Sequence, residues 1–387
     1  MKDVMKFVAI VVVASVSPVW ASDVDGDGVD DAFDVCDNTP AGTLVDAVGR
    51  PVGDIDKDCD NDLDDHALSQ QGFTGPLATL GIVIATVSVG NPGNTGEWSG
   101  ASYGGLGPDR ICGAVDYVYN IGQFEVTAGQ YTVFLNAVAV EDTYGLYNTR
   151  MWDREKGCKI ERTGSSTNYS YSVGAEWADR PVNYVSWADA ARFCNWLHNG
   201  QPTGPQNLTT TEDGSYYLNG ATSDAELMAV VREPDATWVI PSEDEWYKAA
   251  YHKNDGVTGN YWDYPTGNDS VPSNDLVEPI DPGNNATFHD GDWPDPAGYT
   301  IGSPYYRTEF GAHENSGSPY GTFDQGGNVQ EWNEAIFVDP LGSYRGLRGG
   351  MFGDYDPLLH AAYRDRYNAP TYEGGGLYVG FRVAEVP

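Results

Sequence analysis

The chain has 387 residues, with 21 Lys and Arg against 57 Asp and Glu, so its formal net charge is −36 at pH 7. Proteins that bind duplex nucleic acid need clustered cations to displace phosphate counterions, and this balance argues against nucleic acid as a partner. At roughly 150 residues per domain, the length allows two or three folded units. The 47 glycines predict a loop-rich fold, whereas the aromatic content of 12% argues against a generally disordered chain.

The first 21 residues have the pattern of an export signal. Lys2 and Lys6 flank the start of an apolar run at residues 7–16, and residues 19–21 form a cleavage-site pattern that ends in Ala21. The run is shorter than the roughly 20 apolar residues that span a membrane. We therefore predict a cleaved signal peptide at residues 1–21 and a secreted or cell-surface protein without a later integral membrane segment. A second apolar stretch, residues 77–89, predicts a buried strand.

Residues 22–68 form an acidic module in which carboxylates twice take the spacing of a calcium loop. In the first loop the acids fall at positions 1, 3, 5, 9 and 12, with Gly28 at the turn position 6. In the second loop Asn61 takes the turn position. The predicted calcium ligands are Asp23, Asp25, Asp27, Asp31, Asp34, Asp56, Asp58, Asp60 and Asp64. The alternative is a solvated acidic linker.

This module resembles the thrombospondin type 3 calcium repeats of bacterial secreted proteins. The resemblance implies a disulfide between Cys36 and Cys59, which an exported protein can form, and a linker at residues 69–82 would follow. Five cysteines leave at least one free thiol. We expect Cys194 to be a buried apolar residue of a helix, while a bridge between Cys112 and Cys158 stays open.

Beyond the linker, three helices are predicted from capping residues and apolar spacing. Thr127 precedes apolar residues at i, i+3, i+4 and i+7 that begin at Tyr131. The pairs Ser186–Asp189 and Ser242–Glu245 have the capping-box spacing that opens a helix. Short strands and turns are expected elsewhere. The irregular stretch 261–308 is expected to be mobile unless bound cations fix it.

Six ordered motifs between residues 124 and 383 resemble the formylglycine-generating enzymes, or sulfatase-modifying factors. They are FEVT at 124–127, RPVNYVSW at 180–187, IPSEDEW at 240–246, GTFDQGGNVQEW at 321–332, LRGG at 347–350 and VGFRV at 379–383. The resemblance implies an α+β, C-type-lectin-like fold over residues 83–387, with little regular secondary structure and with bound calcium. It is closest to the secreted bacterial members of the family.

The family's oxidase chemistry depends on two cysteines that follow the Arg-Gly-Gly motif and bind copper. The matching positions here are Asp354 and Leu359, so the resemblance implies that formylglycine generation by the known route is lost. The acidic residues near His360 offer an alternative acid–base centre, but ordinary polar loop residues are the favoured interpretation. Enzyme status is left open and leans negative.

The resemblance also implies calcium sites in the large domain. One would use the side chains of Asp324 and Glu331 and the carbonyls of Gly327 and Val329, an oxygen set that suits a hard cation. Gln330 stands where the family usually has tryptophan. A second site would use Asn285 and the Ala286 carbonyl, with one later acid among Asp290, Asp292 and Asp295.

The tyrosine-rich segment 352–378 is the predicted binding face. Tyrosine supplies adaptable contact area at low entropic cost, and in this fold retroelement-diversified proteins vary their ligand contacts here. The predicted ligand-binding residues are Asp354, Tyr355, His360, Tyr363, Arg364, Arg366, Tyr367 and Tyr372. An equally weighted interpretation is that these side chains simply pack.

Three functions follow from these patterns. The first is a calcium-binding recognition protein whose partner is an unknown protein or glycan. The second is an enzyme of the family with a non-standard active centre. The third is an extracellular matrix or filament component that self-assembles with calcium. We favour the first.

Overall fold

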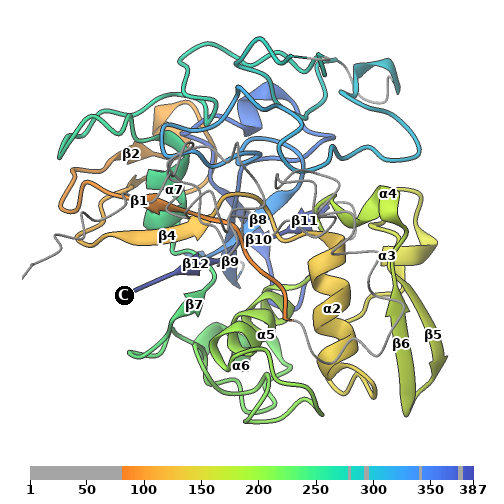
Figure 1. The fold of residues 1–387 in the computed structure, drawn as a ribbon. Coiled ribbons are helices and arrows are strands. Elements are labelled where there is room, and N and C mark those ends of the chain that lie inside the picture. The colour runs from red at the N-terminus through yellow and green to blue at the C-terminus, as the bar shows by residue number, and fades with distance from the viewer. Residues whose placement is uncertain (1–80, 278–279, 292–295, 340–341, 374–377) are drawn as a thin grey trace, which may run out of the picture. The chain divides into compact units, whose positions relative to one another are not determined.

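The computed structural model describes residues 81–387, apart from 278–279, 292–295, 340–341 and 374–377 (Figure 1). The chain divides into two compact units, Met1–Phe73 and Thr74–Pro387, and every described residue belongs to the second. The predicted signal peptide, the acidic calcium module and the Cys36–Cys59 disulfide lie outside the described residues.

The second unit mixes short helices and strands, as the sequence predicts. Its α-helices are α2 (Ala128–Val138), α3 (Arg150–Asp153), α4 (Ala175–Ala178), α5 (Trp187–His198), α6 (Asp224–Ala229) and α7 (Glu243–Tyr251). Its 3₁₀ helices are η2 (Ala101–Tyr103), η3 (Pro296–Gly298) and η4 (Asp356–Leu358). Its strands are β1 (Thr86–Val89), β2 (Glu97–Ser99), β3 (Arg110–Cys112), β4 (Tyr119–Gly122), β5 (Glu161–Ser165), β6 (Asn168–Ser172), β7 (Trp238–Val239), β8 (Gln330–Asp339), β9 (Gly342–Arg348), β10 (Asp365–Asn368), β11 (Val379–Gly380) and β12 (Ala384–Glu385).

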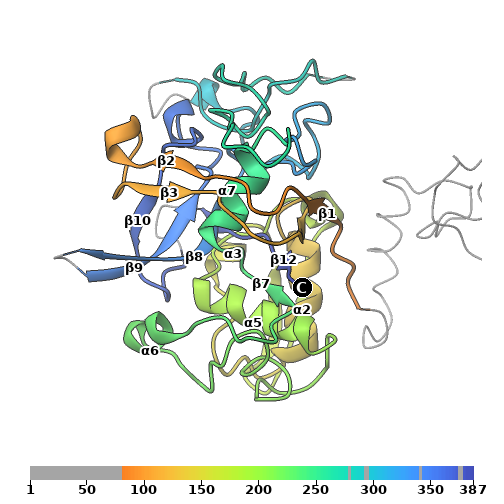
Figure 2. The same ribbon diagram turned by 90° about the vertical axis from the view of Figure 1, so that its left-hand side faces the viewer.

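Two four-stranded sheets organise this unit. The first has the order β1-β4-β12-β7 and is antiparallel throughout, so β12, close to the end of the chain, lies between β4 and β7. The second has the order β10-β9-β8-β11, in which β11 runs parallel to β8. Figure 2 shows β8, β9 and β10 side by side, and long irregular loops occupy the end of the unit above α7. Pairs β2–β3 and β5–β6 form separate two-stranded sheets.

The three predicted helices begin at the predicted caps. Thr127, Ser186 and Ser242 each accept a hydrogen bond from the third helical residue, whose side chain bonds back to the cap. These bonds satisfy backbone donors that have no partner within the helix. The sequence analysis did not predict α6, which begins with the same kind of capping box, formed by Ser223 and Glu226.

The predicted strand at residues 77–89 is wrong in its extent, because the described part is a strand only at Thr86–Val89. At Ile82 the side chain of Gln201 replaces a strand partner. The Ile82 N–H donates to Gln201 Oε1 at 2.6 Å, and Gln201 Nε2 donates to the Ile82 carbonyl at 2.8 Å. The backbone there is satisfied without a ladder.

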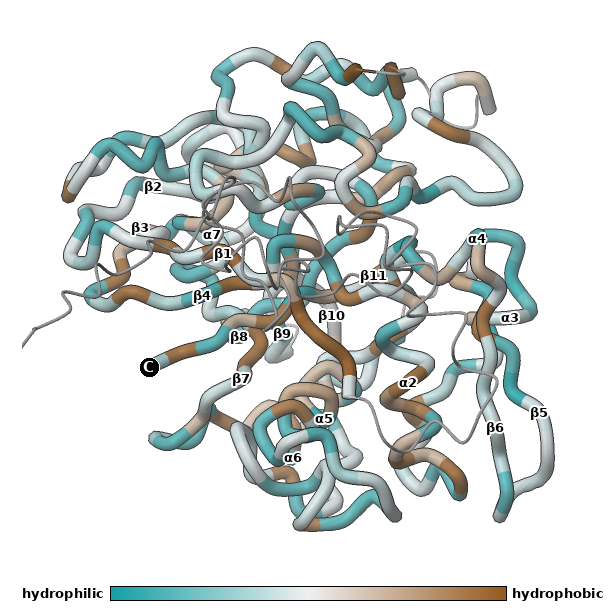
Figure 3. The backbone as a smooth tube through the Cα atoms, in the orientation of Figure 1, coloured by the Kyte–Doolittle hydropathy of each residue, from teal (hydrophilic) through white to brown (hydrophobic). Residues whose placement is uncertain are grey.

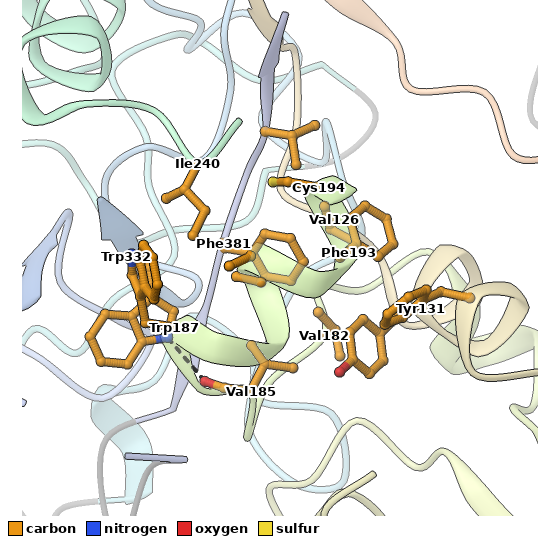
Figure 4. Packing of buried hydrophobic residues seen from close by; sticks show 14 of the residues in the cluster. Val126, Tyr131, Val182, Val185, Trp187, Phe193, Cys194, Ile240, Trp332 and Phe381 are labelled. Carbon is orange, nitrogen blue, oxygen red and sulfur yellow. Dashed lines mark hydrogen bonds between the residues drawn. The ribbon is translucent and has the colours of Figure 1, made fainter. Parts of the chain in front are cut away.

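The main core lies between α2, α5 and the two sheets, and Figure 3 shows the hydrophobic positions of both helices. Tyr131 and Phe193 stack with ring centroids 6.1 Å apart, and Phe381 packs edge-on against both rings. Trp332 is fully buried and donates its indole N–H to the Val185 carbonyl at 3.0 Å (Figure 4). Because buried aromatic rings contribute large apolar areas, this cluster supplies much of the hydrophobic stabilisation.

The described cysteines are all free and buried. Cys194 lies on α5 within the main core, as predicted. Cys158 also belongs to the main core, whereas Cys112 packs in a separate cluster with Trp246 and Tyr247. The Cys112–Cys158 bridge that the sequence left open therefore does not form.

Candidate functional site

The turn that carries the first predicted calcium site is clamped between two distant segments. The Gly327 N–H donates to the Gly349 carbonyl at 2.9 Å, and the Asn328 N–H donates to the Thr287 carbonyl at 2.8 Å. Gly327 has φ 89°, and a Cβ atom there would lie 2.1 Å from the Thr287 carbonyl oxygen. Only glycine fits this close approach.

Three carboxylates converge beneath this turn. Asp324 and Glu331 come from the turn and from β8, and Glu125 comes from the FEVT motif. Burial, followed by the nearby charges of Asp324 and Glu331, raises the pKa of Glu125 well above its usual range. Burial likewise raises the pKa of Asp324. Glu125 accepts from Asn328 Nδ2 at 3.0 Å and from the Val329 N–H at 3.2 Å.

Glu331 is already paired in this arrangement. Arg382 Nε and Nη2 donate to its two oxygens at 2.7 and 2.8 Å, and the Trp246 indole donates to it at 2.8 Å. Both members of the ion pair are fully buried. The remaining Arg382 donors bind backbone carbonyls, including that of Phe323 at 2.9 Å. The pair therefore joins the turn to the last strands of the chain.

The oxygens at this turn fit a hard cation in part. Asp324 accepts a long bond of 3.3 Å from the Gly311 N–H, and the buried Asn328 Oδ1 has no hydrogen-bond partner among the described residues. Glu331 would have to leave Arg382 to bind calcium. Within the described ranges, no group of three or more His, Cys, Asp or Glu side chains is arranged to hold a metal ion. Calcium remains a prediction here.

The second predicted calcium segment is fixed by hydrogen bonds. Asn285 is buried, and its Nδ2 donates to Asp281 Oδ1 at 2.6 Å. Asp281 also accepts from Ser316 Oγ at 2.6 Å and from the Asn315 N–H at 3.1 Å. Burial opposes ionisation of Asp281, but these bonds lower its pKa overall. The sequence analysis did not predict a role for Asp281 in this segment. Two of the predicted acids, Asp292 and Asp295, lie outside the described residues.

The two positions that match the family's cysteines differ in environment. Asp354 accepts from the Met351 N–H at 3.1 Å. Burial raises its pKa to about 7, and Asp365 adds to the shift. Leu359 is fully buried in an apolar cluster with Tyr264 and Phe288. The first position thus holds a carboxyl group that titrates near neutrality, and the second holds no donor.

Asp354 belongs to a polar group that excludes His360. Gln330 Nε2 donates to Asp365 Oδ2 at 2.9 Å, while the buried Gln330 Oε1 has no partner among the described residues. Burial, with Asp365 and Asp354 adding to it, raises the pKa of Tyr363. His360 Nε2 instead lies 3.6 Å from Asp263 Oδ1. The alternative acid–base centre, which the sequence analysis did not favour, therefore receives no support from the geometry as a pair of Asp354 with His360.

Arg364 lies in the interior. Its side chain is 3% exposed and binds Glu243, which also pairs with Arg348 at 2.8 Å. Burial disfavours the Glu243 carboxylate, but the guanidinium groups, Arg348 first, lower its pKa to about 2. We therefore leave Arg364 out of the proposed recognition surface.

The rest of the predicted face divides between surface and core. Tyr355 is 36% exposed, whereas Tyr372 packs against the main core. Arg366 and Tyr367 lie in β10. The tyrosine-rich segment thus both packs and presents side chains.

Beside Asp354, four aromatic rings surround the ammonium group of Lys156. We call Tyr299, Tyr306, Phe352 and Tyr378 with this lysine the Lys156 cage. The Lys156 Nζ lies 4.6 Å from the centroids of Tyr299 and Tyr306, 5.3 Å from Phe352 and 5.6 Å from Tyr378. Its members come from distant segments, so no local pattern in the sequence indicated the cage.

A separate pocket of about 390 Å³ lies near the end of α5 and is lined by His198, Asp213, Tyr217, Glu233 and Asp235. It contains none of the predicted site residues. Among the described residues, no helix is long and apolar enough to cross a membrane.

Comparison with known proteins identifies the family. The sulfatase-modifying factor enzyme 1-like domain matches residues 115–386. The chain belongs to this family. The motif-based prediction of a sulfatase-modifying factor domain is thereby confirmed.

Similar solved structures include Treponema denticola variable protein 1, with 18% identity and a TM-score of 0.46 over 80% of this chain and 98% of that one. CarF has 18% identity and a TM-score of 0.43, covering 79% of this chain and 99% of its own. PvdO from Pseudomonas aeruginosa has 16% identity and a TM-score of 0.43, covering 78% and 94%. A comparison with curated proteins finds no match.

Proposed function

We propose that this sulfatase-modifying factor domain is an exported, calcium-binding recognition module that does not generate formylglycine. The carrying observation is the replacement of the family's cysteine pair by Asp354 and Leu359. A carboxylate is a hard ligand and a leucine side chain has no donor atom, whereas Cu(I) requires soft ligands. The apolar packing of Leu359 further argues against a metal at that position.

The remaining described thiols are poor substitutes for that pair. Thiolates, rather than thiols, bind metals and attack as nucleophiles. Burial raises the pKa of Cys112 to about 11, and burial also raises the pKa values of Cys158 and Cys194. These three thiols therefore stay protonated at neutral pH. They also lie in separate places, since Cys112 is on β3, Cys158 follows α3 and Cys194 is on α5.

Recognition is supported by the aromatic surface at the former catalytic position. Tyr355 is exposed, and the His289 ring lies between Tyr355 and Tyr299, with centroids 5.9 and 4.7 Å away. The His289 N–H also donates to the Asp354 carbonyl at 2.8 Å, which fixes this loop. Ordered tyrosines on a fixed backbone offer contact area with little further entropy to lose on binding.

Two assays on the full chain test this proposal. In the first, copper, oxygen and a Cys-x-Pro-x-Arg peptide are supplied, and the aldehyde product is sought by mass spectrometry. We expect no aldehyde, together with a calcium-dependent rise in the unfolding temperature. An aldehyde would refute the loss of oxidase chemistry.

The second assay screens glycan and peptide arrays with the wild type and with Tyr355→Ala. Tyr217→Ala is the matched control, because Tyr217 is 50% exposed and lines the separate pocket near α5. We expect Tyr355→Ala to lose array signals that Tyr217→Ala retains. Signals that respond equally to both substitutions would contradict recognition at this surface.

The second candidate function is acid–base catalysis. It is favoured by the burial of the Asp354 carboxyl group near Asp365 and Tyr363, an environment that raises the pKa of Asp354 to about 7. A general acid or base works best with a pKa near the working pH. A hydrolase substrate panel, compared between the wild type and Asp354→Asn, tests it. Turnover that Asp354→Asn abolishes would promote this candidate over recognition.

A further inference from the structure

The Lys156 cage places four aromatic rings within 5.6 Å of one ammonium group. Neighbouring rings touch in sequence, with centroid distances of 5.2 Å between Tyr299 and Tyr306, 5.8 Å between Tyr306 and Phe352, and 4.8 Å between Phe352 and Tyr378. Their electron-rich faces attract a cation held within about 6 Å. All four rings lie within that range of the Lys156 ammonium.

The cage holds its cation without a direct ion pair, although this chain is strongly acidic. Lys156 Nζ donates to the Tyr299 hydroxyl at 2.7 Å, and the neighbouring Glu155 carboxylate contacts the cage by accepting from the Tyr306 hydroxyl at 2.7 Å. Metal ions and bare ammonium groups are strongly hydrated and gain most from charged oxygens. A site made of rings favours weakly hydrated organic cations instead.

The backbone around the cage is strained. Tyr306 has φ 61°, and Tyr184, whose ring packs edge-on against Tyr378 at 5.7 Å, has φ 62°. This left-handed conformation is uncommon for bulky residues, and it persists where the surroundings enforce it, often at ligand sites. Two such tyrosines beside one cage indicate that ring placement is maintained against a local energetic cost.

From these observations we propose that the cage is a binding site for a quaternary ammonium group, and that Lys156 occupies it in the absence of ligand. The inference rests on the proposed recognition function, because it names the ligand class of the same surface. A quaternary ammonium group is poorly hydrated and presents methyl groups to every ring. It therefore gains more from this enclosure than a primary ammonium group does.

Lys156 can leave the cage without unfolding the surface. Its carbonyl is fixed by Asn183 Nδ2 at 2.9 Å and by Arg307 Nη1 at 2.8 Å, so the backbone stays in place when the side chain moves. The side chain is partly exposed, and its ammonium group regains hydration in solvent. Occupation by Lys156 lowers the apparent affinity for an external ligand by the fraction of time that the cage is open.

The test measures choline binding to the full chain by calorimetry. Lys156→Ala empties the cage, so we expect its affinity for choline to be at least about tenfold higher than that of the wild type. Lys156→Met refills the cage with an uncharged chain of similar length and should bind no better than the wild type. Lys253→Ala is the matched control, because Lys253 lies 3.7 Å over the single ring of Trp262, away from the cage. It should leave choline affinity unchanged.

Two further probes distinguish the source of the quaternary group. Tighter binding of phosphocholine than of a trimethyllysine peptide would indicate a headgroup or decorated glycan, and the reverse would indicate a protein tail. Either result supports the proposal. If Lys156→Ala keeps the near-ultraviolet circular dichroism of the wild type and binds none of the probes, the proposal is overturned. Array signals that depend on Tyr355 would then still support recognition of another ligand class.

Discussion

Substituting Glu331→Gln tests whether the buried Glu331–Arg382 pair, rather than calcium, is the main partner of this carboxylate. The substitution removes the negative charge, so the fully buried Arg382 guanidinium keeps the amide oxygen of the new glutamine and backbone carbonyls as acceptors but loses its ionic partner. Breaking a buried ion pair by removing one partner costs about 3–5 kcal/mol. For a domain of this size we expect a fall in Tm on the order of 10 °C.

The assay is urea unfolding in the presence of a chelator, followed by tryptophan fluorescence, so that calcium cannot contribute. Glu141→Gln is the control, because Glu141 is exposed and such substitutions usually change stability by less than about 0.5 kcal/mol. In a double-mutant cycle, Arg382→Met should destabilise the Glu331→Gln background much less than the wild type. A loss below about 1 kcal/mol for Glu331→Gln in chelator would refute the assigned pairing.

The remaining predictions concern Asp354, the turn glycine and a helix cap. The pKa of Asp354 is raised to about 7, so the contribution of its protonated form to stability is complete below the unfolded-state pKa and is lost as the pH rises through 7. Between pH 4 and pH 8, the denaturant midpoint of Asp354→Asn should therefore fall less steeply than that of the wild type. Gly327→Ala should prevent stable folding because its Cβ meets the Thr287 carbonyl at 2.1 Å, whereas Gly90→Ala, with nothing within 4 Å, should be neutral in the same expression and melting assays. Thr127→Ala should lower the unfolding free energy by about 1 kcal/mol in urea, since it removes the N-cap of α2; an unchanged midpoint would contradict the cap assignment.

Several elements of the fold could be predicted from local sequence. The caps at Thr127, Ser186 and Ser242 mark helix starts because their bonds reach only three residues along the chain. The ordered motifs were sufficient to identify the family. The extent of β1 was misjudged because the partner that ends it, Gln201, lies 119 residues away.

The candidate site likewise has some features that local sequence determines and others that depend on distant partners. The sequence by itself determined that Asp354 and Leu359 stand where copper-binding cysteines would be, and that Gly327 lies in a tight turn, since residue identity and motif spacing are local properties. Only the tertiary structure decided that Glu331 pairs with Arg382, that Asp354 lies with Asp365 rather than His360, and that four distant rings enclose Lys156. Each of these contacts joins segments far apart in the chain. Their partners are chosen by packing and charge in the folded interior, and spacing along the sequence carries no record of that choice.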